Sequence, residues 1–205
     1  MGDKNHWERV YTEKTVDSVS WFQTYPTMSM KLINATGLAK HEAIIDVGGG
    51  ASVLVDTLVN EGFSKVSVLD IAGAALEYAK KRLADKAAAV EWFEHDVTTF
   101  VPPHSFHLWH DRAVFHFLTD AAARTRYLDV LAKAVPVGGH VIIATFAPEG
   151  PEQCSGLMVE RYDEAKIVPL FAPRFILVEK VSELHRTPAL KDQQFNYFRF
   201  RREVA

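Results

Sequence analysis

Cysteine is nearly absent from this 205-residue sequence: Cys154 is the only one, so no disulfide can form within the chain. Long apolar runs are also missing, since none approaches the roughly 20 residues that span a bilayer. Residues 1–6 lack the apolar core of a signal peptide. Disulfides and signal peptides are typical of secreted proteins, so these absences predict a cytoplasmic protein with no membrane partner.

A strong excess of charge of either sign is missing as well. The 23 lysine and arginine residues are balanced by 26 aspartate and glutamate residues, which gives a net charge of −3. Domains that bind nucleic acid usually carry a pronounced positive surface. We therefore expect no nucleic-acid partner.

The histidines raise the hypothesis of a metal site, because five of the nine lie between residues 95 and 116. However, no two histidines are spaced as H-x-x-x-H, and a cysteine-containing ligand set is missing. His107 and His110 would point to opposite faces of an extended strand. We therefore expect no metal site.

What the sequence does contain is the composition of a folded domain. Apolar residues make up 48% and charged residues 24%, close to globular averages. Strand-like apolar runs alternate with helix-like stretches, which predicts an α/β fold with helices on both faces of a mostly parallel sheet. We expect a single domain over residues 1–205, with an aromatic-rich segment at 1–40 before a core at 41–205. Helices are predicted at 27–38, 51–61, 74–83, 121–135 with Thr119 as the N-cap, and 161–170.

A glycine-rich turn between two apolar runs is the most informative motif. The run that contains Asp46 leads into Gly48, Gly49 and Gly50, and a second run ends at Asp70. Glycines permit positive φ and let backbone N–H groups approach a ligand closely. An acid at the tip of the next strand is placed to accept hydrogen bonds from ribose hydroxyls. Together these residues predict a pocket for an adenosine-bearing cofactor.

The spacing of the glycines argues against a dinucleotide. The G-x-G-x-x-G/A fingerprint needs a small third residue, and Val53 occupies that position. Asp46 would also repel a pyrophosphate, whereas it suits a ligand with a positive charge.

The pattern D-x-G-G-G-x-S with a distal acid resembles motifs I and II of the class I S-adenosylmethionine-dependent methyltransferases, with Ser52 in place of the usual third glycine. The resemblance implies S-adenosylmethionine as cofactor, with the glycines beside its methionine part. It also implies a Rossmann-like three-layer sandwich whose seven-stranded sheet is mostly parallel with an antiparallel late strand. Residues 90–97, 106–116 and 135–146 are similar to the family's third to fifth strands. The cofactor residues that it implies are Trp21, Tyr25, Asp46, Gly48, Gly49, Gly50, Asp70, Ile71, Asp96, Val97 and Asp111.

Acids follow four predicted strands, at Asp46, Asp70, Asp96 and Asp111. In open α/β sheets, ligands bind outside the carboxyl ends of the strands, where the strand order reverses. Each aspartate by itself is equally well explained as a helix cap or turn residue. Four at one rim favour a binding site, since strands disfavour aspartate.

Methyl transfer requires positioning more than acid–base chemistry, because the sulfonium is already activated. A base is needed chiefly when the acceptor enters protonated. In the loop after the fourth strand, Asp111 is a candidate to hold an ammonium, Arg112 to bind an acceptor anion, and His116 to remove a proton. The alternative is that Asp111 and Arg112 pair with each other while His116 packs or caps a helix.

Two segments are candidates to cover the site. The first carries Trp7, Tyr11, Trp21, Phe22 and Tyr25. In related methyltransferases such a segment folds over the cofactor; the alternative is that the rings form a small accessory core. The second is the Gly- and Pro-rich stretch at 147–170, expected on the acceptor side, in which Cys154 is either packing or catalytic.

The sequence is compatible with four functions. A small-molecule methyltransferase is favoured, because the chain carries little beyond the cofactor fold. A protein-lysine methyltransferase is the main alternative, on the similarity of the N-terminal and Asp111–His116 segments to that branch. An NAD-dependent oxidoreductase and a non-enzymatic cofactor-binding protein are further alternatives. We expect a monomer or a weak homodimer.

Overall fold

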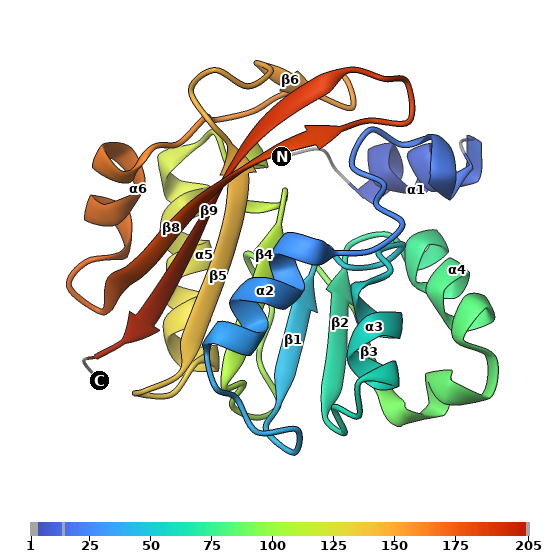
Figure 1. Ribbon diagram of the computed structural model, residues 1–205, viewed down its shortest axis with the longest axis horizontal. Helices are drawn as coiled ribbons and strands as arrows, with labels where there is room; N and C mark the ends of the chain where they lie inside the picture. The colour runs from blue at the N-terminus through green and yellow to red at the C-terminus, as the bar shows by residue number, and fades with distance from the viewer. Residues whose placement is uncertain (1–3, 14, 204–205) are drawn as a thin grey trace.

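The computed structural model describes residues 4–13 and 15–203, which form one seven-stranded sheet with helices on both sides (Figure 1). The strand order is β3-β2-β1-β4-β5-β9-β8. β9 runs antiparallel to both of its neighbours, while the other sheet pairs are parallel. The expected Rossmann-like sheet with an antiparallel late strand is therefore confirmed. Its strands are β1 (Ile44–Val47), β2 (Val66–Asp70), β3 (Val90–Glu94), β4 (Leu108–Arg112), β5 (His140–Phe146), β8 (Phe175–Arg186) and β9 (Asp192–Arg202).

The helices begin and end close to the predicted positions. The helix expected over 51–61 begins only at Leu54, because the residues before it form the turn after β1. The helices are α1 (Lys4–Glu13), α2 (Thr27–Ala35), α3 (Leu54–Asn60), α4 (Gly73–Leu83), α5 (Ala121–Ala134) and α6 (Glu164–Phe171), with 3-10 turns η1 (Val16–Ser18), η2 (Ala84–Ala89) and η3 (Phe115–Phe117). Among the described residues, none of these helices combines the length and apolarity needed to cross a bilayer.

The predicted N-cap of α5 was wrong by one residue. Asp120, not Thr119, holds the extended backbone of an N-cap, and its carboxylate accepts a hydrogen bond from the N–H of Ala123 at 2.9 Å. A carboxylate at this position satisfies a free N–H group and also interacts favourably with the positive end of the helix dipole.

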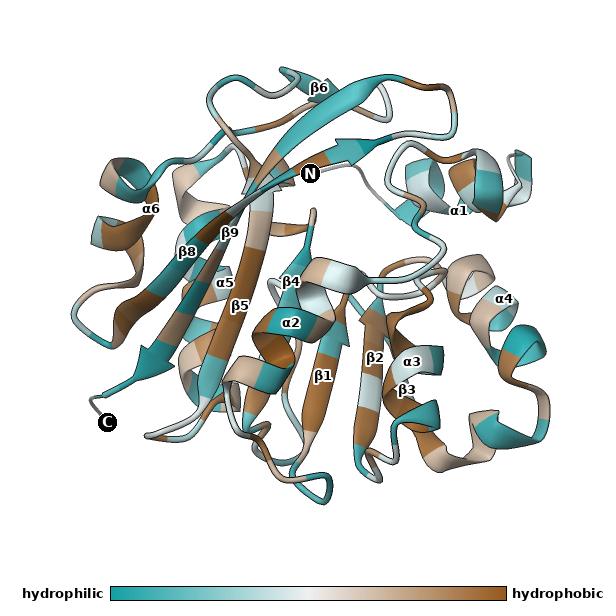
Figure 2. Cartoon of the chain, viewed as in Figure 1, coloured by the Kyte–Doolittle hydropathy of each residue, from teal (hydrophilic) through white to brown (hydrophobic). Residues whose placement is uncertain are grey.

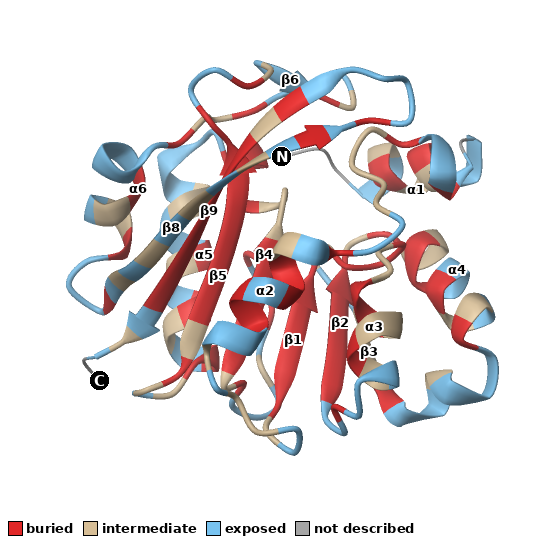
Figure 3. Ribbon diagram, in the orientation of Figure 1, coloured by how far each residue is buried: buried red, intermediate tan, exposed pale blue. Residues whose placement is uncertain are grey.

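Two apolar cores lie on opposite faces of the sheet. Neighbouring residues of a strand point to opposite faces, so Ile44 belongs to the core under α2, α3 and α4, whereas Ile45 belongs to the core under α5 and α6. Apolar residues run along β1, β2 and β5 (Figure 2), and the same strands are buried throughout most of their length (Figure 3). The sheet is therefore a rigid platform for residues at its strand ends.

The N-terminal segment and the long β8–β9 hairpin meet above the carboxyl ends of the strands (Figure 1). His185 Nε2 on β8 lies 2.8 Å from the carbonyl oxygen of Ser20, and Gln23 Nε2 donates to Glu183 at 3.4 Å. The short hairpin of β6 (Gln153–Cys154) and β7 (Leu157–Met158) lies at the same end. The strand order reverses between β1 and β4, directly beneath these segments.

Candidate functional site

The turn after β1 brings backbone close to neighbouring side chains at each of its three glycines. Gly48 has φ +67°, and a Cβ there would collide with Val114. A Cβ on Gly49 would collide with the carboxylate of Asp46, and one on Gly50 with that of Asp70. Only glycine fits these positions without displacing Val114 or one of the two acids, which explains the motif physically.

Asp70 lies at the tip of β2, beside this turn. It is buried, and its two carboxylate oxygens accept hydrogen bonds from the N–H groups of Gly50 at 3.0 Å and Ala72 at 2.9 Å. Burial raises the pKa of Asp70 to about 6, against the opposing effect of these two N–H groups. Each oxygen keeps a second lone pair, so the carboxylate can still accept hydroxyl hydrogen bonds.

Arg82, near the end of α4, holds the glycine turn from behind. Its guanidinium donates to the carbonyl oxygens of Ala51 at 3.1 Å and Ser52 at 2.6 Å, and its Nε donates to Asp56 at 2.9 Å. The sequence analysis missed this residue, because an arginine near a helix end carries no motif of its own. The Ser52 hydroxyl in turn accepts from the N–H of Leu54 and starts α3.

A cavity lies over the carboxyl ends of β1, β2 and β4. Asp70 is the only carboxylate among the described residues that line it. The lining residues are Trp7, Tyr11, Trp21, Val47, Gly48, Leu69, Asp70, Ile71, His95, Val97, Arg112, Ala113, Val114, Phe117 and Cys154.

A second cavity adjoins the first. Trp21, Val47, Gly48 and Arg112 line both. The second cavity is bounded by the glycine turn on one side and by the start of α2 on the other, and Asp46 belongs to its wall. An elongated ligand can therefore extend from Asp70, past Gly48, to Asp46.

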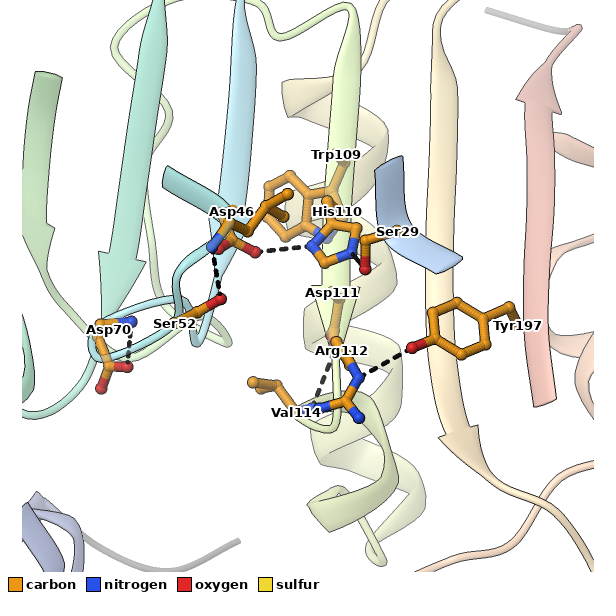
Figure 4. A network of polar contacts seen from close by, with 12 residues as sticks. Ser29, Asp46, Ser52, Asp70, Trp109, His110, Asp111, Arg112, Val114 and Tyr197 are labelled. Atoms are coloured by element: carbon orange, nitrogen blue, oxygen red, sulfur yellow. Dashed lines mark hydrogen bonds and ion pairs between the residues drawn. The ribbon is translucent and has the colours of Figure 1, made fainter. Parts of the chain in front are cut away.

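Asp46 belongs to a buried row of polar side chains (Figure 4). Its Oδ1 lies 2.7 Å from Nδ1 of His110 on the neighbouring strand β4, and His110 Nε2 lies 2.9 Å from the hydroxyl of Ser29 on α2. The other oxygen, Oδ2, is buried and has no hydrogen-bond partner among the described residues.

Arg112 is tied to the segments above the sheet and not to Asp111. Its Nε donates to the hydroxyl of Tyr197 at 2.9 Å, and its Nη1 donates to the carbonyl oxygen of Trp21 at 3.0 Å. Nη2 lies 4.0 Å from Glu183 without a hydrogen bond. The alternative in which Asp111 and Arg112 pair with each other was therefore wrong.

Asp111 points away from both cavities. It is fully buried and accepts hydrogen bonds from the hydroxyl of Tyr127 at 2.7 Å and from the N–H groups of Val114 at 2.9 Å and Phe115 at 3.1 Å. Burial raises its pKa to about 6, although these donors oppose the shift. Its observed contacts support the loop after β4 and leave no oxygen aimed at a ligand.

His116 is also closed off from both cavities. Its ring is fully buried between Phe117 and Phe146, with Nδ1 3.5 Å from the N–H of Phe146. Burial lowers its pKa to about 3, with a further contribution from Arg112. A base at this position would be weak and out of reach of a ligand in the described cavities.

The remaining expected cofactor residues divide in two. Ile71 and Val97 line the first cavity, as does His95, which the sequence analysis did not single out. Asp96 lines neither cavity, because its carboxylate accepts hydrogen bonds from the N–H and hydroxyl of Thr98, both at 2.8 Å. Tyr25 lines neither cavity and is half exposed.

Helix α1 closes the first cavity from above. The Glu8 carboxylate accepts from the N–H groups of Gly73 at 2.7 Å and Ala74 at 3.2 Å, so it caps α4 from outside that helix. Trp7 stacks edge-on against Trp21 and Phe117. Over residues 4–13 and 15–203, no three histidine, cysteine or acidic side chains come together as a metal site.

The match to a family model decides among the candidate families. Residues 44–139, which contain the glycine turn, Asp70 and β4, match the model described as a methyltransferase domain. Residues 44–139 of the chain therefore carry a methyltransferase domain. The expected family is confirmed, and the match favours it over the oxidoreductase and the non-enzymatic alternatives.

Two curated proteins to which this chain is similar act on different acceptors by name. The eEF1A lysine and N-terminal methyltransferase of Bos taurus is 24% identical over 154 residues, 72% of this chain. Malonyl-[acyl-carrier protein] O-methyltransferase 1 of Ilyobacter polytropus is 25% identical over 134 residues, 65% of this chain. The matches span 22% and 48% of the length of these relatives.

Solved structures share the fold across nearly the whole chain. The N-methyltransferase NodS from Bradyrhizobium japonicum WM9, in complex with S-adenosyl-l-homocysteine, has a TM-score of 0.71 at 15% identity and covers 96% of this chain and 98% of its own. A structure from work on the conversion of a disulfide bond into a thioacetal group during echinomycin biosynthesis has a TM-score of 0.79 at 16% identity, covering 98% and 92%.

Proposed function

We propose that this protein transfers a methyl group from S-adenosylmethionine to a small-molecule acceptor. The observation that carries the proposal is the pair of adjoining cavities, with Asp70 at one end, Gly48 between them and the unpartnered oxygen of Asp46 at the other. Asp70 would accept the ribose hydroxyls, and Ile71 and Val97 would border the adenine. The glycine turn and Asp46 would hold the methionine part.

The side chains of the first cavity favour a small acceptor over a protein lysine. Its walls include Trp7, Tyr11, Trp21 and Phe117, and Asp70 is its only carboxylate among the described residues. A lysine ammonium would therefore find no acidic partner there once Asp70 binds ribose, and it would meet the positive charge of Arg112. An aromatic or apolar acceptor that is neutral or anionic suits these walls better.

Positioning is the contribution that these residues make to the reaction. S-adenosylmethionine would supply a methyl group bound to a sulfonium. The acceptor would attack the methyl carbon in line with the carbon–sulfur bond, and S-adenosylhomocysteine would leave. Trp7, Tyr11 and Trp21 would exclude water from the reacting atoms, while Arg112 would orient an acidic group of the acceptor. Cys154 lies on the same wall, where the 147–170 segment would cover the acceptor.

Two measurements test this function. Calorimetry should show micromolar or tighter binding of S-adenosylhomocysteine and much weaker binding of NAD. Methyl transfer from labelled S-adenosylmethionine should then appear with members of a metabolite panel and not with proteins of a cell lysate. Tighter binding of NAD would contradict the cofactor, and labelled lysines in the lysate would contradict the acceptor class.

We also propose a cellular location and an oligomeric state for the protein. Its near-balanced charge and single cysteine support a cytoplasmic location without a nucleic-acid partner. Sedimentation at several concentrations would test for a monomer or weak homodimer.

A further inference from the structure

The row of Ser29, His110 and Asp46 joins three elements beside the second cavity (Figure 4). The three residues are only 1%, 2% and 2% exposed, respectively. Buried polar groups are costly unless their hydrogen bonds are made, so a row of this kind needs a reason beyond folding. Apolar residues of similar shape would join α2 to the sheet without the free-energy cost of burying polar groups.

The hydrogen bonds of the row determine which way each group faces. A carboxylate oxygen accepts, so Nδ1 of His110 is the donor to Oδ1 of Asp46 over 2.7 Å. His110 Nε2 lies 2.9 Å from the Ser29 hydroxyl, which can donate to this nitrogen or accept from it. Ser29 thus holds the far side of the His110 ring, and His110 fixes the rotation of the carboxylate.

Fixing one oxygen of Asp46 also places the other. Asp46 lines the second cavity, and a Cβ on Gly49 would lie only 2.2 Å from its Oδ2. This oxygen has no hydrogen-bond partner among the described residues. A buried carboxylate oxygen in this position would be satisfied by a positively charged N–H donor. The ammonium of an amino-acid group is such a donor, and it would fit beside three glycines.

We propose that Ser29 and His110 are positioning residues that hold Asp46 for the ammonium of the cofactor's methionine part. The proposal rests on the proposed function, since it assumes that this cofactor fills both cavities. Without the row, the carboxylate is free to rotate about a torsion with broad minima, and Oδ2 no longer faces the ammonium.

The test compares two ligands that differ only at the methionine end. S-adenosylhomocysteine carries the amino-acid group, whereas methylthioadenosine lacks it and keeps the adenosine. His110→Leu should weaken S-adenosylhomocysteine binding by about tenfold or more and methylthioadenosine binding by less than about twofold. Ser29→Ala should show the same selectivity with a smaller loss. His110→Asn, whose amide can still donate near the position of Nδ1, should recover most of the affinity.

Asp70→Ala is the matched control, because its ribose contact is common to both ligands and both should weaken equally. Equal losses for the two ligands in His110→Leu and Ser29→Ala, or no loss in either, would overturn the positioning role. Should His110→Leu fail to fold, Ser29→Ala and His110→Asn decide by the same comparison. Wild-type protein that binds neither ligand would instead contradict the proposed function itself.

The same three residue types form the triad of serine hydrolases, so a nucleophilic Ser29 is the competing interpretation. Incubation with a fluorophosphonate and mass spectrometry separates the two. We expect Ser29 to stay unmodified, since it is almost completely buried within α2. Labelling of Ser29 would overturn the proposal.

Discussion

At the scale of single residues, burial raises the pKa of Asp70, so the stability of the folded protein should depend on pH. Its pKa is raised from 3.8 to about 6 in the folded protein, so the fold binds its proton more tightly than the unfolded chain does. The stability that it contributes is therefore complete below about pH 4 and is lost as the pH rises through about 6. The shift corresponds to about 3 kcal/mol at most.

We predict that Asp70→Asn will remove this pH dependence. Asp111 carries a similar shift, so the wild type should lose stability between pH 4 and 7 through both residues, and the variant through one. Urea unfolding across this range measures the difference. A free-energy difference between wild type and variant that does not change with pH would contradict the assignment.

His116 gives a second prediction at this scale. With a pKa of about 3, the ring stays neutral at working pH and has little tendency to take up a proton. We therefore predict that His116→Asn will reduce turnover by less than about tenfold and will leave the pH profile near 6–7 unchanged. A general base would instead cost about 10²- to 10⁴-fold. A loss of that size, with unchanged cofactor affinity, would restore His116 as the base.

At the scale of elements, the glycine turn depends on α4. Arg82 donates to two carbonyl oxygens of the turn, whereas lysine has a single point charge and cannot reproduce this fork. We predict that Arg82→Lys will weaken S-adenosylhomocysteine binding by about five- to tenfold, because the turn loses its rear support. Calorimetry measures the change.

Asp56→Asn is the control for Arg82. It alters the partner of Arg82 while leaving both carbonyl contacts in place. We expect it to change cofactor affinity by about twofold or less. Comparable losses in the two variants would show that the ion pair, and not the support of the turn, is what matters.

At the scale of the whole molecule, the site is complete only when the N-terminal segment meets the core. Glu8 caps α4, Arg112 binds the carbonyl oxygen of Trp21, and His185 lies against that of Ser20. These contacts come from three distant parts of the chain. They make closure of the first cavity a property of the tertiary fold, and they place Tyr11 near Asp70, where burial and that charge raise its pKa.

We predict that Glu8→Gln will loosen α1 and that the cofactor will tighten it. The neutral amide loses the favourable interaction with the helix dipole, so amide hydrogen exchange within residues 4–13 should become faster. S-adenosylhomocysteine should slow exchange there in the wild type and less so in the variant. If the rate of amide hydrogen exchange in α1 changes with neither the substitution nor the ligand, the segment is not a lid.

The sequence by itself determined the fold class and the placement of Asp46, the three glycines and Asp70 at the carboxyl ends of neighbouring strands. The order of Asp46, three glycines and Asp70 depends on local backbone geometry and on adjacent strands, so it can be followed along the chain. Alternation along β4 also predicts that His110 and Asp111 point to opposite faces. Which of them lines a cavity was decided only by tertiary structure. Ser29 and Tyr127, from helices on opposite sides of the sheet, bind His110 and Asp111 respectively. Such partners are distant in sequence, and no local pattern specifies them, because side-chain direction at a strand end depends on what packs above and below it.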